Sequence, residues 1–383
     1  MIKKFGKTFL ILIFLIELSL SQAFKLSGYF SEFAIYQNVK EEFAQTFGIG
    51  KNLSVNISRL RLRPEFDLAK IGKIYIEYEV DGFYHSSELF FNPVELTSRR
   101  QLYKMRWALH DGKKLEIYHL IDRFYIRKDF NFGNLIIGRQ RISWGTGRVW
   151  NPTDLFNPIN PADFSKIEKD GADAVTWKIY LGSFTDLHIV YNPVNRFKSN
   201  NFGFRFRSNA KGFDFSFMSG YFDKRGIAGF DFAGNFLNAG IRGEGIISAD
   251  VKNLRSNFLK FILGFDNQFT KNFYALFEYQ FNGEGKTKKE EYEIERLTRG
   301  EILNLSKSYA FISAVYTINP ILSLTFSLNQ NLNDWSGFVN ALLSYSPTEN
   351  SEVGFGIIMF FGDKLDEYWY YSTSGFFKLQ IFF

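Results

Sequence analysis

Arginines that recur at short, even spacings are the groups in this sequence best placed to act on a solute. A guanidinium is charged at every physiological pH and binds carboxylates and phosphates through a planar fork of N–H donors. Side chains two or four positions apart in a strand share one face, so these arginines form rows of positive charge. The rows are Arg59, Arg61 and Arg63; Arg123 and Arg127; Arg139 and Arg141; and Arg205 and Arg207, with Arg148 following the third row.

Acidic residues accompany two of these rows. Glu77 and Glu79 lie on the strand expected after the first row, and Asp214 lies on the strand expected after the last. In one interpretation, the arginines and the acids form ion pairs that stiffen the sheet to which their strands belong. In the other, uncompensated arginines create a field across a pore that favours anions. We expect Asp214 to offset Arg205 and Arg207, and both interpretations remain open.

The segment 138–158 is the most distinctive in the chain. A strand carrying Arg139 and Arg141 runs into Trp144 and Gly145, and the loop that follows contains Pro152, Pro158 and Pro161. Proline fixes the backbone and removes a hydrogen-bond donor, so this loop is stiff and is not a strand. We expect Arg139, Arg141 and Arg148 to contribute most to any anion preference.

The pattern Gly-Arg-Gln, Trp-Gly and Asn-Pro-Thr-Asp in this segment resembles that of eighteen-stranded porin-like barrels related to the alginate exporters. The motif covers about twenty residues, and the rest of the chain matches in architecture alone. The resemblance implies that the loop near 143–169 folds into the lumen and narrows it; the alternative is an ordinary structured extracellular loop. The residues assigned to this constriction are Trp144, Gly145, Asn151, Pro152 and Asp154.

The C-terminal strand carries a second resemblance. Apolar and polar residues alternate in this strand: the apolar ones are Phe377, Leu379, Ile381 and Phe383, and the polar ones are Lys378 and Gln380. This pattern predicts one apolar face and one face in contact with water. An amphipathic last strand that ends on Phe is similar to the insertion signal of bacterial outer-membrane barrels. Together with many other alternating segments, it predicts an all-β, transmembrane antiparallel barrel of about eighteen strands.

The two ends of the chain set the domain organisation. Residues 1–23 combine a positive start, an apolar run and small residues at 21 and 23, as a cleaved signal peptide does. Residues 24–383 contain no composition break and are predicted to form a single barrel. The chain has 46 Phe and 45% hydrophobic residues; beyond the signal, no segment is long enough for a spanning helix, so alternating strands must carry this apolar surface.

Enzymatic and nucleic-acid functions find little support. There are four His and no Cys, and none of the histidines has metal-type spacing or a nucleophile motif nearby. We therefore expect no catalytic residue, metal or cofactor. The basic residues are spread along strands, which argues against nucleic-acid binding.

The sequence favours an outer-membrane porin for passive or facilitated diffusion of small hydrophilic solutes. The more specific expectation is that the channel prefers anions. The alternative is a substrate-specific export or uptake channel for acidic polysaccharide or oligosaccharide, and a third class is a structural barrel whose loops block the lumen. The expected location is the outer membrane of a Gram-negative-type envelope. The expected partners are its lipid and lipopolysaccharide, the barrel-assembly machinery and the solute, and the expected state is a monomer or homotrimer.

Overall fold

The computed structural model describes residues 23–47, 50–87, 100–156, 168–194, 200–250, 252–253, 256–298 and 301–383. The predicted signal peptide lies outside these ranges except for Ala23. The strands are β1 (Phe24–Asn38), β2 (Asn52–Asp67), β3 (Lys73–His85), β4 (Arg106–Asp111), β5 (Leu115–Phe130), β6 (Gly133–Gln140), β7 (Ala172–Tyr180), β8 (Asp186–Asn192), β9 (Asn201–Ala210), β10 (Phe213–Phe222), β11 (Arg225–Phe236), β12 (Ala239–Ala249), β13 (Phe258–Thr270), β14 (Phe273–Asn282), β15 (Ser308–Asn319), β16 (Leu322–Asn331), β17 (Gly337–Thr348), β18 (Ser351–Phe361) and β19 (Ser374–Phe382). The short helices are α2 (Glu41–Phe47), η4 (Lys289–Glu291), α3 (Ile294–Thr298) and η5 (Glu367–Tyr370).

Within the described ranges, no helix has the length and apolar character needed to cross a membrane.

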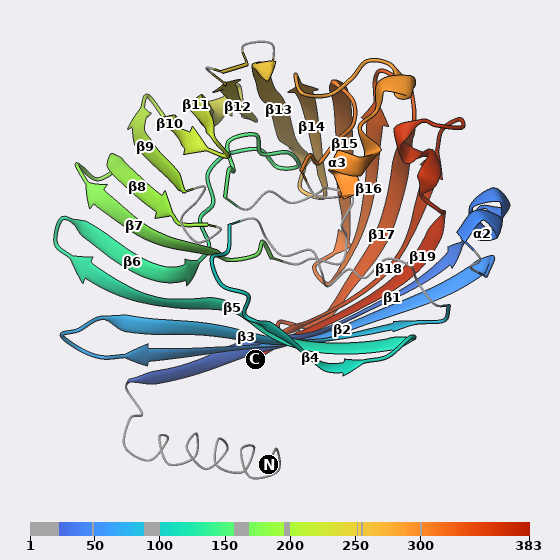
Figure 1. Ribbon diagram of the computed structural model, residues 1–383, viewed down its shortest axis with the longest axis horizontal. Helices are drawn as coiled ribbons and strands as arrows, with labels where there is room; N and C mark the ends of the chain where they lie inside the picture. Colours follow the sequence, from blue (N-terminus) through green and yellow to red (C-terminus); the bar gives the residue numbers. More distant parts are fainter. Residues whose placement is uncertain are drawn as a thin grey trace, which may run out of the picture.

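The strands close into a barrel (Figure 1). Every strand except β4 pairs with a neighbour on each side, and β1 pairs with both β2 and β19, which closes an 18-stranded antiparallel ring. At the seam, the backbone N–H of Gly28 donates to the carbonyl of Phe383 at 2.8 Å, and the N–H of Phe383 donates to the carbonyl of Gly28 at 3.1 Å. Closure leaves no edge within the ring itself, and the prediction of about eighteen strands is confirmed.

A β-bulge in β5 interrupts the regular alternation. Residues 124–130 of β5 pair with β6, while residues 116–120 pair with the short extra strand β4. Between these two partners the register against β3 shifts, so Glu77 lies opposite Arg123 while Tyr78 lies opposite Ile121. A bulge lets consecutive side chains point to one face. Asp122 and Arg123 are accordingly both buried, and both take part in the site described below.

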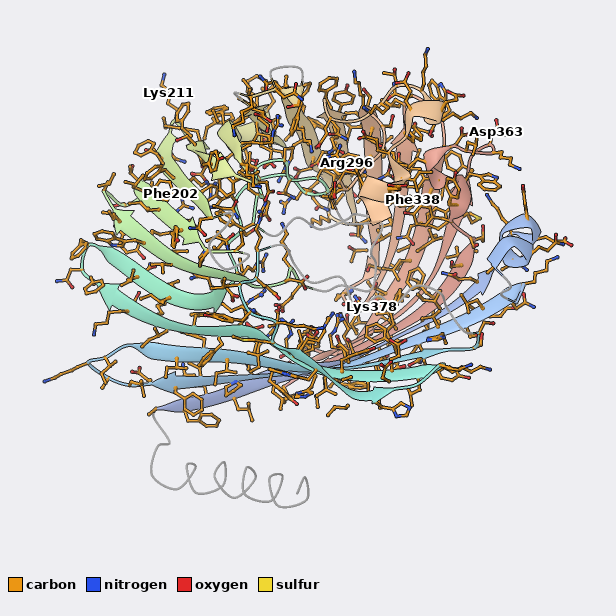
Figure 2. The ribbon with its side chains drawn as sticks, in the orientation of Figure 1. Phe202, Lys211, Arg296, Phe338, Asp363 and Lys378 are labelled. Atoms are coloured by element: carbon orange, nitrogen blue, oxygen red, sulfur yellow. The ribbon has the colours of Figure 1, made fainter. Side chains whose placement is uncertain are left out.

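The two faces of the wall differ in chemistry. On β16, Leu324 and Phe326 are exposed on the outside, while Ser327 and Asn329 are buried inside. On β19, Ile381 is exposed and its neighbour Gln380 is buried. Figure 2 shows Arg296, Phe338 and Lys378 toward the inside of the ring and Lys211 at its outer edge. The sequence alternation therefore corresponds to an apolar outer face and a mostly polar inner face.

One polar spot interrupts the outer face. Glu32 pairs in register with Ser58, one position away from the inward pair Ser31 and Arg59, so Glu32 and Ser58 face outward. The Ser58 hydroxyl lies 2.7 Å from the Glu32 carboxylate and 3.2 Å from the Asn56 side-chain oxygen. These contacts satisfy part of the polar groups at the junction of β1 and β2.

We predict that charge is tolerated on the inner face of β16 and not on the outer face. Phe326→Lys places an ammonium near the middle of the outer belt, where the cost in a bilayer is about 2–4 kcal/mol. Thr325→Lys, one residue earlier, puts the same charge in the lumen. The measurement is the fraction of folded barrel after refolding into lipid vesicles, followed by heat-dependent gel mobility. Equal folding of the two variants would contradict the assignment of faces.

Candidate functional site

The connection from β6 to β7, residues 141–171, is called the inner loop here. Its described parts are residues 141–156 and 168–171, and Figure 1 shows residues 141–156 as a green segment that runs inside the ring of strands. Its backbone is irregular for a local reason. Gly145 has φ of 97°, and a Cβ there would lie 2.5 Å from the Glu244 carboxylate. A Cβ on Gly147 would lie 1.9 Å from the carbonyl of Trp150, so neither position admits a side chain.

Two glutamates on the barrel wall hold the backbone of the inner loop. Glu278 on β14 accepts hydrogen bonds from the N–H groups of Arg148 at 2.9 Å, Val149 at 3.2 Å and Trp150 at 2.8 Å. Glu244 on β12 accepts from Thr146, from Gly147 at 3.2 Å and from Thr153 at 3.2 Å. Both carboxylates are buried. Charge-assisted bonds of this kind are about twice as strong as neutral ones, so the two glutamates define the path of residues 146–153.

Two tryptophans anchor the same segment by packing. The Trp144 ring lies 5.2 Å from that of Phe156, and its Nε1 donates to His188 Nδ1 at 3.1 Å. Trp150 packs seven strands further round the ring than His188 of β8, with its ring 6.0 Å from Tyr309 on β15. Both indoles are almost fully buried. Burial of two large aromatic side chains adds to the carboxylate bonds and keeps the segment against the wall.

The last residues of the inner loop bind to the opposite side of the barrel wall. Glu168 forms ion pairs with Arg61, at 3.0 Å, and with Arg63. Arg123 donates to the carbonyl of Lys169, and the N–H of Gly171 donates to Asp122 at 3.0 Å. The bulge in β5 is therefore what presents both partners, Asp122 and Arg123, to residues 169–171.

The inner loop connects opposite walls. Its first part binds Glu244 on β12, and its last part binds arginines on β2. Because β4 is not part of the ring, β2 is the second strand of 18 and β12 is the eleventh, halfway round. An ion pair between Asp154 and Lys169 joins the two parts directly. The loop thus forms a continuous line of contacts across the lumen.

Eight of the ten predicted pore arginines pair with a carboxylate. Arg59 lies 2.8 Å from Asp81, and Arg61 contacts Glu77, Glu79, Asp122 and Glu168 at 2.6 to 3.0 Å. The remaining pairs are Arg63 with Glu77 and Glu168, Arg123 with Asp122, Arg127 with Asp129, Arg139 with Asp173, Arg205 with Asp231 and Arg207 with Asp186. Among the described residues, the guanidinium groups of Arg141 and Arg148 have no ion pair, and both residues are exposed.

Two expectations about these charges are wrong in detail. Asp214 does not offset Arg205 and Arg207, because it lies across the tight turn from Asn209 and bonds to that side chain at 2.9 Å. Arg139 and Arg141 do not share a face, because β6 ends at Gln140 and the alternation stops there. Arg139 is 3% exposed and is held by Asp173 at 2.7 Å, whereas Arg141 is exposed.

The remaining predicted residues lie in two places. Asn151, Pro152 and Asp154 form a turn of the inner loop, in which the N–H of Asp154 donates to the carbonyl of Asn151 at 3.1 Å. Phe377 contacts Phe355 of the neighbouring strand, with ring centroids 5.2 Å apart, and Ile381 and Phe383 are exposed. Sequence reasoning missed Glu244 and Glu278, although each is a lone acid at an inward position of an apolar strand.

A second connection, residues 283–307 between β14 and β15, borders the lumen near the first part of the inner loop. The N–H of Leu305 donates to the Glu367 carboxylate at 3.0 Å, and the Tyr309 hydroxyl donates to it at 2.6 Å. Glu367 lies in η5, in the loop between β18 and β19. Burial raises the pKa of Glu367 to about 7, and the hydrogen bond from Tyr309 only partly opposes this effect.

The described residues contain no group of three or more His, Asp or Glu side chains placed to hold a metal ion.

We predict that removal of one wall carboxylate releases the inner loop. Glu278→Gln replaces an acceptor oxygen by an amide that cannot accept from three N–H groups, and each lost bond to a charged group is worth about 1.5–3 kcal/mol. Hydrogen exchange of residues 148–150 should accelerate by roughly tenfold or more. Glu293→Gln, in the loop between β14 and β15, is the control. Unchanged exchange in Glu278→Gln would show that packing alone holds the loop.

We also predict a pH-dependent attachment of the 301–306 segment. The pKa of Glu367 is raised from 4.5 to about 7, so its contribution to stability is complete below pH 4.5 and is lost as the pH rises through about 7. Exchange protection of Leu305, corrected for intrinsic rates, should therefore be higher at pH 5 than at pH 8. Glu367→Gln should remove this difference, and Glu290→Gln should keep it. A wild-type protein with equal protection at both pH values would refute the prediction.

Comparison with known proteins bears on the fold. No protein-family model and no curated protein matches the chain. The chain is similar to the crystal structure of Acinetobacter baumannii OccAB2, with 8% identity, a TM-score of 0.55 and coverage of 94% of this chain and 98% of that chain. It is also similar to a structure described as "Asymmetric conductivity of engineered proteins", with 9% identity, a TM-score of 0.50 and coverage of 94% and 100%. A mutant of the Rh. blastica porin aligns over 94% and 100% at 9% identity, with a TM-score of 0.49. The likeness to the first two of these structures shows that the chain has the fold of a porin-like outer-membrane β-barrel.

Proposed function

We propose that this protein is an outer-membrane channel through which small hydrophilic solutes cross by passive or facilitated diffusion. The observation that carries the proposal is the closed ring of 18 strands with an apolar outer face and a polar, charged lumen. In a bilayer, each unsatisfied backbone group costs several kcal/mol, and a closed barrel avoids this cost completely. Barrels of this strand number are wide enough to hold an aqueous channel.

The inner loop sets the width of the channel in this proposal. It is fixed at both sides of the lumen by carboxylates and arginines, and the ion pair between Asp154 and Lys169 joins its two parts. A solute has to pass beside this crossing. This arrangement suits small solutes better than a long polymer, so we favour diffusion of small solutes over the alternative of acidic polysaccharide export.

Charge pairing limits where a preference for anions can arise. Arg139 is compensated by Asp173, so its field at a distance is small. Arg141 and Arg148 are the two predicted pore arginines without an ion pair among the described residues, and they flank Trp144 in the inner loop. Their charges act in a partly enclosed space, where screening by water is reduced. We therefore assign a modest anion preference to Arg141 and Arg148.

Targeting and assembly follow from the two ends of the chain in this proposal. Residues 1–23 direct export and are removed, and the strand ending in Phe377, Leu379, Ile381 and Phe383 is the signal read by the barrel-assembly machinery. The apolar outer face then contacts outer-membrane lipid and lipopolysaccharide. If the protein is a homotrimer rather than a monomer, the polar spot at Glu32, Asn56 and Ser58 is where a neighbouring copy would supply the missing partners.

Recording in a planar bilayer tests the channel and its charge preference. The wild-type protein should conduct in potassium chloride. Arg141→Ala with Arg148→Ala should move the reversal potential in a salt gradient toward that of a cation-preferring pore, with the chloride-to-potassium permeability ratio falling by roughly twofold. Lys70→Ala with Lys271→Ala removes the same charge at the tight turns and is the control.

The possible results separate the claims. A wild-type protein without conductance would contradict the channel and favour a barrel with a blocked lumen. Conductance with the same reversal potential in all three proteins would retain the channel and eliminate the anion preference.

A further inference from the structure

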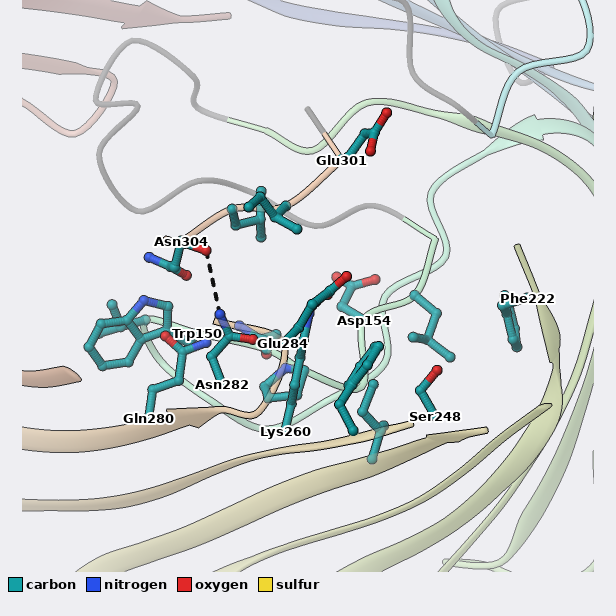
Figure 3. A pocket seen from close by; sticks show the side chains of 18 of the residues that line it. Trp150, Asp154, Phe222, Ser248, Lys260, Gln280, Asn282, Glu284, Glu301 and Asn304 are labelled. Carbon is teal, nitrogen blue, oxygen red and sulfur yellow. Dashed lines mark hydrogen bonds and ion pairs between the residues drawn. The ribbon is translucent and has the colours of Figure 1, made fainter. Parts of the chain in front are cut away.

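A cavity of about 700 Å³ lies in the lumen near the loop ends of the strands. It is bounded by residues 148–155 of the inner loop, by side chains of strands β10 to β17 and by residues 301–304. Figure 3 shows Gln280, Asn282, Lys260 and Ser248 rising from the wall, with Trp150 and Asp154 contributed by the inner loop. Its volume falls within the range of about 300–1,000 Å³ that is usual for small-molecule sites.

Four of the lining side chains carry a buried polar atom without a partner in the protein. These atoms are Trp150 Nε1, Gln280 Oε1, Asn282 Oδ1 and Asn340 Oδ1. All four residues are more than nine-tenths buried. An unsatisfied buried polar group costs about 1–3 kcal/mol, so four around one cavity indicate a surface built to receive hydrogen bonds from a bound molecule.

The amide of Asn282 has a defined orientation. Its Nδ2 donates to the carbonyls of Ser306 at 3.1 Å and Asn304 at 3.4 Å, and the second of these bonds is drawn in Figure 3. The Oδ1 atom is therefore the free end. With Gln280 and Asn340, three carbonyl oxygens present acceptors, while Trp150 supplies one donor. A hydroxyl group both donates and accepts, whereas a carboxylate has no proton to offer these acceptors.

Four of the six cations that line the cavity pair closely with carboxylates, whereas Arg148 has no ion pair within the described part of the chain and Arg225 lies 3.9 Å from Asp250. Lys260 lies 2.7 Å from Glu284, and Arg100 lies 2.6 Å from Asp223. Lys169 pairs with Asp154, and Arg296 pairs with Glu284, Glu293 and Glu301. An anion at any of these four paired cations would have to compete with the carboxylate already bound there. An uncharged solute avoids that competition and brings no charge into a partly dehydrated space.

Aromatic rings supply the rest of the lining. Phe338 and Phe311 project from β17 and β15, and Phe258 lies between the cations of Arg225 and Lys260 at 4.9 Å from each. Rings of this kind offer flat apolar faces. Cyclic polyols combine a flat C–H face with hydroxyls around the edge, which matches a lining of aromatic faces and amide oxygens.

We propose that this cavity binds an uncharged, hydroxyl-rich solute of mono- or disaccharide size. The inference rests on the proposed channel and names the class of solute held in it. Gln280, Asn282 and Asn340 accept hydrogen bonds from solute hydroxyls, the indole N–H of Trp150 donates one, and the aromatic rings contact the C–H face.

Inhibition of ion current by sugars provides the test. Potassium chloride conductance is recorded first, and glucose or maltose is then titrated. The wild-type current should fall along a saturating curve.

Gln280→Leu and Asn340→Leu should raise the half-saturating concentration by about tenfold each, as loss of about 1.4 kcal/mol predicts. Replacing an unpartnered buried amide by Leu does not remove an existing bond, so both variants should fold. Gln268→Leu, near the opposite end of the lumen, is the matched control and should behave as wild type.

A binding measurement that needs no channel keeps the two proposals distinguishable. Maltose should change the tryptophan fluorescence of the detergent-solubilised protein, and Trp150→Phe should abolish the change. Conductance without saturable sugar inhibition, or equal inhibition in Gln280→Leu and wild type, would overturn the binding site while leaving the channel. Tighter binding of glucuronate than of glucose would overturn the preference for uncharged solutes.

Discussion

Six backbone N–H groups of the inner loop converge on two wall carboxylates, and the organisation of the lumen depends on this arrangement. Residues 146–150 have consecutive N–H groups without partners in any strand or helix. Inside a partly dehydrated barrel such groups are costly, and Glu244 and Glu278 satisfy them. The same contacts position Trp150 and residues 151–155, so the edge of the cavity also follows from them.

Much of the barrel follows from local sequence and much of the site does not. Alternation of apolar and polar residues gives the strands and their faces, because a bilayer permits little else. The bulge at Asp122 has no comparable signal, since it depends on where β4 and β6 end against β5. The partners of Arg205 and Arg207 were misassigned for a related reason. Both partners lie across strands in a register that sequence proximity does not reveal.

The glutamates that hold the inner loop show what a sequence signal can and cannot supply. Glu244 between two glycines and Glu278 between Phe277 and Tyr279 are recognisable as inward acids on apolar strands. Neither forms an ion pair within the described residues, which distinguishes them from Glu77 and Glu79, which pair with arginines. That they bind backbone N–H groups 91 to 130 residues away is a property of the folded chain. The motif around Trp144 and Gly145 predicted the loop, but the wall residues that bind the loop could be identified only from the structure.

The position of the inner loop also has a consequence for the order of biogenesis. Its two seats belong to strands on opposite sides of the ring, and an incomplete sheet does not hold them at their final separation. The loop therefore docks late, after the seam between β1 and β19 has formed. In the proposed channel, docking of the loop is therefore the step that narrows the lumen to its final width.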